Sequence, residues 1–147
     1  MEIQTTKFGV VEVNEQSVFR FVEPIIGYND LTDYVIIQHD ENSPFKWLQS
    51  TQDPDLTFPV TTAAFFSIDY VFEISDEDAE KIELESPEEL IVLNIATIPS
   101  ENPQSATLNL LAPIIINSNN KMAMQLILVN SNYSTKTRLF QEPKADN

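Results

Sequence analysis

Residue types that perform catalysis are scarce in this chain of 147 residues. It has no cysteine, which excludes disulfides, thiolate metal sites and thiol catalysis. His39 is the single histidine, so one chain cannot form a paired-histidine metal site, and any Ser-His-Asp triad would have to use this residue. The two glycines, Gly9 and Gly27, lie too far apart for a phosphate-binding loop. The sequence therefore argues against nucleotide, zinc and nucleophilic chemistry.

Carboxylates are the one abundant reactive group, with 23 Asp and Glu residues. An EF-hand that began at Asp76 would need glycine at its sixth position and glutamate at its twelfth, but Lys81 and Pro87 stand there. Two carboxylates that the fold brings together could still support acid–base catalysis, and such an enzyme is the third and weakest alternative. We therefore expect no catalytic activity, no metal and no cofactor.

The acidic charge is large and unevenly distributed. The formal net charge is −15, and residues 71–90 contribute −8 of it, with nine acids and one base. A field of this sign repels the backbone of nucleic acids, so we expect no direct binding of DNA or RNA. The same field accelerates association with a basic protein. The local sequence is equally compatible with an ordinary solvated helix surface.

The hydrophobic pattern that surrounds these acids is mainly that of β-strands. Ile68, Tyr70, Phe72 and Ile74 alternate with more polar residues, which is the period of a half-buried strand. Short apolar runs rich in branched residues indicate strands buried on both faces; they are Tyr34–Gln38, Leu90–Ile98 and Met122–Val129. We expect an all-β, mainly antiparallel fold: a compact β-barrel or sandwich-like single domain.

Local signals predict one helix and two hairpins. Ser75 precedes three acids, which predicts a short acidic helix near residues 76–82, and Ser86 followed by Pro87 predicts one further helical turn. A first hairpin is predicted to join residues 8–13 to 18–22, and a second to turn at residues 118–121. With so few glycines, we expect asparagine to supply positive backbone φ angles at turns.

The chain shows no targeting or membrane signal. Its first ten residues lack a basic segment followed by an apolar one, and no apolar run approaches the roughly 20 residues of a membrane helix. We expect one domain over residues 1–140 and a disordered tail at 141–147. We also expect a monomeric cytoplasmic protein that does not bind membranes.

Two stretches of sequence resemble a known family. The first is Ser43–Ser50, continued by Asp53–Phe58, and the second is Ala106–Asn117, continued by Gln125–Leu128. Together, and in this order, they are similar to the flagellar assembly factor FliW family over roughly residues 1–140. The chain departs from the family at Pro24–Tyr28, where members usually have a Gly-Leu-Pro-Gly-Phe-like stretch.

The resemblance implies a binding protein without catalysis. Such proteins bind flagellin in the cytoplasm and, when flagellin is secreted, bind the RNA-binding regulator CsrA and relieve its repression of flagellin translation. The runner-up interpretation, which needs only the charge, is an acidic all-β binding module for another basic protein.

Seven residues are predicted to face a partner, in three groups. Phe45 is the predicted apolar anchor. The loop acids flank the first family motif and are Glu41, Asp53 and Asp55. The helix acids lie on the predicted helix and are Asp76, Glu77 and Glu80.

Overall fold

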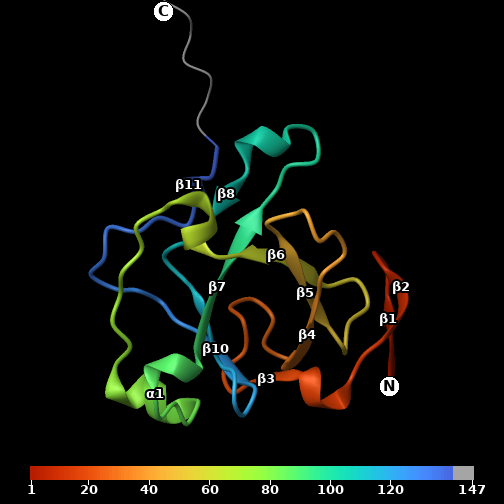
Figure 1. Ribbon diagram of the computed structural model, residues 1–147, viewed down its shortest axis with the longest axis horizontal. Coiled ribbons are helices and arrows are strands. Elements are labelled where there is room, and N and C mark those ends of the chain that lie inside the picture. The colour runs from red at the N-terminus through yellow and green to blue at the C-terminus, as the bar shows by residue number, and fades with distance from the viewer. Residues whose placement is uncertain (141–147) are drawn as a thin grey trace, which may run out of the picture.

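The protein is described by a computed structural model over residues 1–140, and its regular elements are mostly short β-strands (Figure 1). The strands are β1 (Glu2–Thr5), β2 (Gly9–Glu12), β3 (Phe19–Phe21), β4 (Asp33–Ile37), β5 (Lys46–Ser50), β6 (Thr57–Thr61), β7 (Leu90–Thr97), β8 (Thr107–Leu108), β9 (Ile114–Asn117), β10 (Met122–Gln125) and β11 (Thr137–Arg138). The helical elements are α1 (Asp76–Lys81) and 3-10 turns at Glu15–Ser17, Ala63–Phe66, Pro87–Glu89 and Pro103–Ser105. The tail predicted at 141–147 lies outside the described residues.

Seven of these strands close into a barrel. Their order is β7-β6-β5-β4-β3-β10-β9, and pairing of β9 with β7 closes the ring. Only β3 and β10 pair in parallel among the strands of residues 1–140, so the prediction of a mainly antiparallel β-barrel is confirmed. β8 and β11 extend the sheet beyond β7, while β1 and β2 form a separate hairpin at the side opposite α1 in Figure 1.

The barrel interior is filled by one or two apolar side chains from each strand. The buried members of this cluster are Phe21, Ile25, Tyr34, Leu48, Val60, Leu93, Ile114, Ile116 and Ala123. Ile115 lies between two of them on β9 and is also fully buried, but it belongs to a different cluster. Because successive side chains of a strand point to opposite faces, β9 is buried on both faces.

A second layer covers the outer face of β9 and β10. Ile115 and Met124 pack there with the fully buried Ile82, which follows α1, and with Tyr70, Phe72 and Ile74 from the segment before α1. This covering layer, residues 68–84, places α1 at one end of the barrel (Figure 1). Within residues 1–140, no helix is long and apolar enough to cross a membrane.

Two local predictions from the sequence are wrong. The first hairpin pairs β1 with β2, whereas residues 15–17 form a capped 3-10 turn and β3 pairs with β4 and β10. Residues 68–74 keep the alternating burial of a strand but join no ladder, because the barrel they cover is already closed. The acidic helix, the 3-10 turn at Pro87–Glu89 and the β9–β10 hairpin are confirmed.

Asparagine shapes the β9–β10 turn through its side chains more than through its backbone. Lys121 adopts the positive φ in this turn, at 66°. The side-chain oxygens of Asn117 and Asn120 accept hydrogen bonds from the backbone N–H groups of Asn119 and Met122, both at 2.9 Å. Of the four non-glycine residues with positive φ in the described chain, Asn130 is the one asparagine, so the sequence-based expectation holds at one position only.

Candidate partner-binding site

The helix α1 begins and ends with well-formed caps. Ser75 is the N-cap, and its hydroxyl oxygen accepts a hydrogen bond from the backbone N–H of Asp78 at 3.1 Å. At the other end, the N–H of Leu84 donates to Ala79 O and that of Glu83 donates to Glu80 O, which is a Schellman motif. Glu83 takes the left-handed position with φ of 53°, where glycine is usual. These caps allow a helix of six residues to hold its shape.

Side chains of the β9–β10 hairpin bind the C-terminal end of α1. The side-chain amide of Asn117 donates to the carbonyls of Ile82 and Glu83, at 3.0 and 3.1 Å, and the amide of Asn120 donates to Ile82 O at 3.0 Å. Asn117 ends β9 and Asn120 lies in the turn that follows, so the same hairpin that continues into β10 also fixes the helix. The helix therefore has a defined position on the barrel.

One lysine partly neutralises the helix. The ammonium of Lys81 lies 2.9 Å from a carboxylate oxygen of Glu23 and 3.6 Å from one of Asp78. The hydrogen bond to Glu23 raises the pKa of Lys81, so this ammonium stays charged. The helix acids themselves are all solvent-exposed and make no ion pair within residues 1–140. They are consequently available to a cationic partner.

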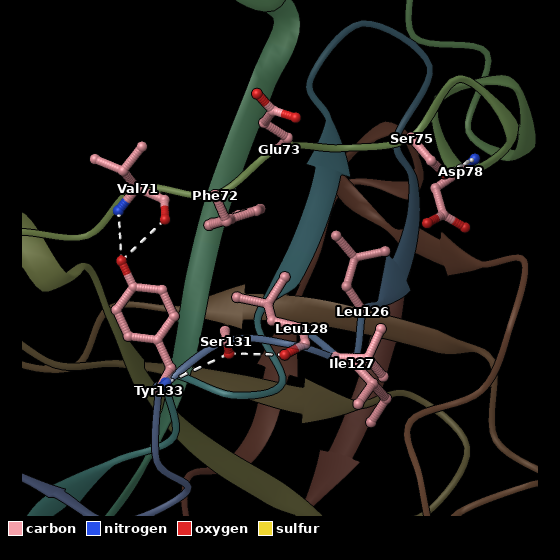
Figure 2. Close-up of a pocket in the computed structure, with 11 residues that line it drawn as sticks. Val71, Phe72, Glu73, Ser75, Asp78, Leu126, Ile127, Leu128, Ser131 and Tyr133 are labelled. Atoms are coloured by element: carbon pink, nitrogen blue, oxygen red, sulfur yellow. Dashed lines mark hydrogen bonds between the residues drawn. The ribbon is translucent and has the colours of Figure 1, made fainter.

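A groove of about 410 Å³ lies beside the start of α1 (Figure 2). The 71–75 segment forms one side of it and the 126–131 segment the other. The lining includes three exposed apolar side chains, Val71 at 74%, Ile127 at 48% and Val129 at 73% exposure. The carboxylates of Glu73 and Asp78 belong to the same lining. The groove thus combines apolar contact surface with negative charge.

Tyr133 closes one end of this groove. Its hydroxyl donates to Val71 O at 2.9 Å and accepts from Val71 N–H at 2.9 Å, as Figure 2 shows. Its ring packs edge-to-face against Tyr70, with centroids 4.8 Å apart. Tyr70 in turn donates its hydroxyl to Leu110 O at 2.6 Å and accepts from the side-chain amide of Asn94 at 3.3 Å. Burial raises the pKa of Tyr70 to about 12, so its hydroxyl remains a protonated donor at neutral pH.

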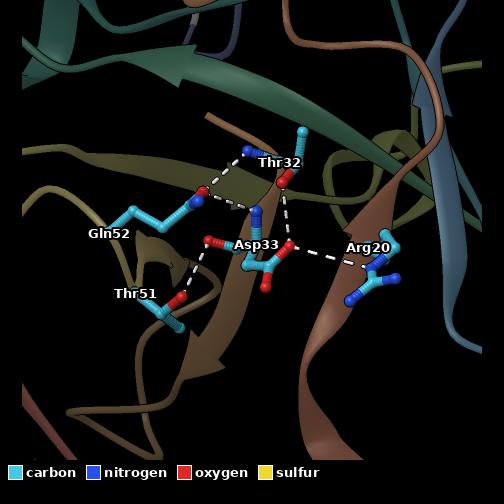
Figure 3. Close-up of polar contacts among 5 residues, drawn as sticks. All are labelled: Arg20, Thr32, Asp33, Thr51 and Gln52. Atoms are coloured by element: carbon cyan, nitrogen blue, oxygen red, sulfur yellow. Dashed lines mark hydrogen bonds and ion pairs between the residues drawn. The ribbon is translucent and has the colours of Figure 1, made fainter. Parts of the chain in front are cut away.

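The loop acids lie apart from the helix acids. The turn between β5 and β6 that bears Asp53 and Asp55 is tied to β4 by Gln52, whose side-chain oxygen accepts from Thr32 N–H and Asp33 N–H (Figure 3). Thr51 N–H also donates to Asp33 O at 3.0 Å.

Asp53 and Asp55 also have structural contacts of their own. The carboxylate of Asp53 accepts from Asp55 N–H at 2.9 Å, and that of Asp55 accepts from the hydroxyl of Thr6. Glu41 is exposed on the separate loop between β4 and β5. The structure therefore does not bring all six acids together.

Phe45 is half-buried and packs against a core cluster that includes Ala63 and Leu108. Its ring lies 5.7 Å from that of Phe66. The neighbouring Phe65 is far more accessible, with 63% exposure. The anchor role of Phe45 stays a prediction.

The sequence did not indicate the groove. The run that contains Ile127 and Val129 was interpreted as a strand buried on both faces, but beyond β10 only the alternate residues Leu126 and Leu128 are buried. Residues 126–129 are all apolar, so the sequence carries no signal that Ile127 and Val129 are exposed. Across residues 1–140 there is also no group of three His, Cys, Asp or Glu side chains placed to hold a metal ion.

Comparison with known proteins identifies similar chains. The family described as FliW protein matches residues 2–139. The flagellar assembly factor FliW of Alkaliphilus metalliredigens is 40% identical over 143 residues, which cover 97% of this chain and 88% of that protein. The one from Caldanaerobacter subterraneus subsp. tengcongensis is 40% identical over 145 residues, covering 98% and 96%. A crystal structure of the flagellar assembly factor FliW matches with a TM-score of 0.89 and 31% identity, covering 97% of this chain and 99% of that one.

Proposed function

This chain belongs to the FliW family of flagellar assembly factors, and from that premise we propose that it acts in the cytoplasm by exchanging two protein partners. It binds flagellin and, when flagellin leaves, binds the RNA-binding repressor CsrA and so relieves repression of flagellin synthesis. It does so without catalysis, as a monomer, and without contacting nucleic acid or membrane itself.

The concentrated acidic surface around α1 supports this proposal most directly. An RNA-binding repressor must present basic surface to its RNA, and the helix acids offer a complementary field on a well-anchored element. A protein that captures such a repressor through this field would at the same time repel the RNA. Flagellin, in contrast, presents amphipathic segments, so its contact depends more on apolar surface and less on charge.

Two variants with equal charge change test the placement of the CsrA contact. The helix variant neutralises the helix acids and is Asp76→Asn, Glu77→Gln and Glu80→Gln. The loop variant neutralises the loop acids and is Glu41→Gln, Asp53→Asn and Asp55→Asn. Both raise the net charge by three, so a difference in association rate between the two variants depends on where the acids lie and not on the net charge of the protein. The amide oxygens of the loop variant also keep the acceptors that Asp53 and Asp55 supply.

The measurement is the association rate of each purified variant with CsrA and with flagellin, at several salt concentrations. We expect the helix variant to associate with CsrA roughly 3- to 10-fold more slowly than the loop variant at low salt. The difference should fade at about 0.5 M salt, where the Debye length is only a few ångströms. Equal rates for the two variants would refute the placement on α1. If the unaltered protein binds neither partner at low salt, the proposed function is wrong.

A further inference from the structure

The segment that leads into α1 has the side-chain pattern of a strand but an almost unpaired backbone. Tyr70, Phe72 and Ile74 pack against the core, while Val71 and Glu73 point to solvent. Within residues 1–140, the N–H and C=O of Glu73 have no hydrogen-bond partner. Those of Val71 are satisfied only by the Tyr133 hydroxyl, which occupies the place that a neighbouring strand would take. This segment therefore has backbone groups free to pair with another extended chain, as the edge strand of a sheet does.

The opposite side of the groove, residues 126–129, is hydrogen-bonded to the barrel on the side away from the groove. Leu126 and Leu128 donate their backbone N–H groups to Pro113 O and Leu111 O, both at 2.8 Å, and so pair away from the groove. Ile127 lies between them; its C=O accepts from Val129 N–H at 2.9 Å, and its N–H has no partner within residues 1–140. Figure 2 shows the two segments on either side of the groove, joined at one end by Tyr133.

We propose that this groove binds an extended peptide segment of a partner by β-strand addition, with the backbone of Glu73 as the pairing edge. Natural proteins usually protect open edges, and an edge left accessible beside apolar side chains is suited to pairing with another chain. Alternate apolar side chains of the peptide would contact Val71, Ile127 and Val129, which are otherwise exposed to water.

The charge of the groove specifies which peptide fits. Glu73 and Asp78 line it, and Asp76 and Glu77 follow at the start of α1. Lys81, the last residue of α1, contacts Glu23 and Asp78. The occupant is accordingly a segment that alternates apolar residues with lysine or arginine. This inference goes beyond the proposed function, because it specifies a mode of recognition that neither flagellin binding nor CsrA binding requires.

The test uses three fluorescent peptides of about eight residues. The first alternates valine with lysine, the second alternates valine with glutamate, and the third is the lysine peptide with alternate backbone nitrogens methylated, prepared in both registers. Anisotropy titration against the full chain should show the lysine peptide binding at least 10-fold more tightly than the glutamate peptide. At least one N-methylated register should lose binding by a similar factor, because methylation removes the ladder donors on one edge.

Two protein variants isolate the backbone contribution. Glu73→Pro and Glu73→Ala both remove the carboxylate, but only proline also removes the N–H. We expect the proline variant to bind the lysine peptide at least 10-fold more weakly than the alanine variant. In the unaltered protein, hydrogen exchange at residues 72–75 should slow when the peptide binds, which tests the pairing even if the proline variant folds poorly.

Three results would overturn the inference: no binding of the lysine peptide at about 1 mM, equal binding of the proline and alanine variants, or unchanged hydrogen exchange at residues 72–75 in the complex. Binding of intact flagellin and CsrA is measured in parallel. If those proteins bind while the peptide arm fails, strand addition is refuted and the proposed function stands.

Discussion

The hydroxyl of Tyr133 offers a quantitative test of how the groove is held in shape. It makes two hydrogen bonds of 2.9 Å to the backbone of Val71 and links the 126–133 region to the covering layer. Tyr133→Phe removes both bonds and leaves the ring in place, where its edge-to-face packing on Tyr70 does not need the hydroxyl. The substitution therefore isolates the polar link from the packing of the ring.

The expected loss of stability follows from the exposure of these bonds. A typical hydrogen bond contributes about 0.5–1.5 kcal/mol net, and both Val71 groups are accessible to water that can replace the hydroxyl. The lower end of that range applies, which gives about 1 kcal/mol for the pair. For a chain of this length the melting temperature should fall by about 3–5 °C.

Tyr28→Phe is the matched control. The ring of Tyr28 also packs edge-to-face, against Phe58, with the two ring centroids 5.3 Å apart. Its hydroxyl, however, has no hydrogen-bond partner within residues 1–140. Its loss should change the free energy of unfolding by less than about 0.5 kcal/mol. The assay is urea unfolding followed by tryptophan fluorescence, with hydrogen exchange at residues 70–73. Equal stability of the two variants, or unchanged exchange in Tyr133→Phe, would refute the assignment of the hydroxyl as a structural link.

Three further substitutions test other parts of the fold. Burial raises the pKa of Tyr34 to about 12, so the unfolded chain loses this proton first as pH rises, and stability falls between pH 10 and 12. From pH 9 to pH 11 the free energy of unfolding of Tyr34→Phe should therefore fall by about 1 kcal/mol less than that of the unaltered protein. Parallel pH profiles of the two proteins would contradict this. Ser75→Ala should cost about 1 kcal/mol in urea unfolding through loss of the α1 N-cap, against no loss for the exposed Ser100→Ala. Asn117→Ala should cost about 1–3 kcal/mol and accelerate hydrogen exchange in α1, because Glu83 O loses its side-chain donor and Ile82 O keeps only the amide of Asn120. Protected α1 amides would show that the helix does not need this anchor.

The features that sequence could predict are those that depend on neighbouring residues. The start of α1 follows from Ser75 and the acids after it, since capping and charge act within one helical turn. The β9–β10 hairpin follows from the polar Ser118–Lys121 turn between two apolar runs. The apolar runs at Tyr34–Gln38 and Leu90–Ile98 likewise form strands, β4 and β7. In each case the signal and its structural consequence lie within a few residues.

The features that sequence missed depend on partners far along the chain. The segment 8–13 could pair with residues before it or after it. In the structure it pairs with β1 through a tight turn that ends at Gly9, which has a positive φ. The hydrogen bonds of Asp53 and Asp55, to each other and to Thr6, depend on how the N-terminal hairpin meets the β5–β6 turn. Such contacts have no periodic signature in the sequence. The partner-facing role of these two acids stays a prediction.

The most informative difference is the strand-like segment at residues 68–74. Its alternation correctly predicts which side chains are buried, but a closed barrel has no free edge, so the segment cannot enter the sheet it covers. It lies instead on the outer face of β9 and β10, where it covers Ile115 and Met124. An unpaired backbone edge beside α1 is the consequence. The unpaired edge beside the groove therefore originates in the closure of the barrel by β7 and β9.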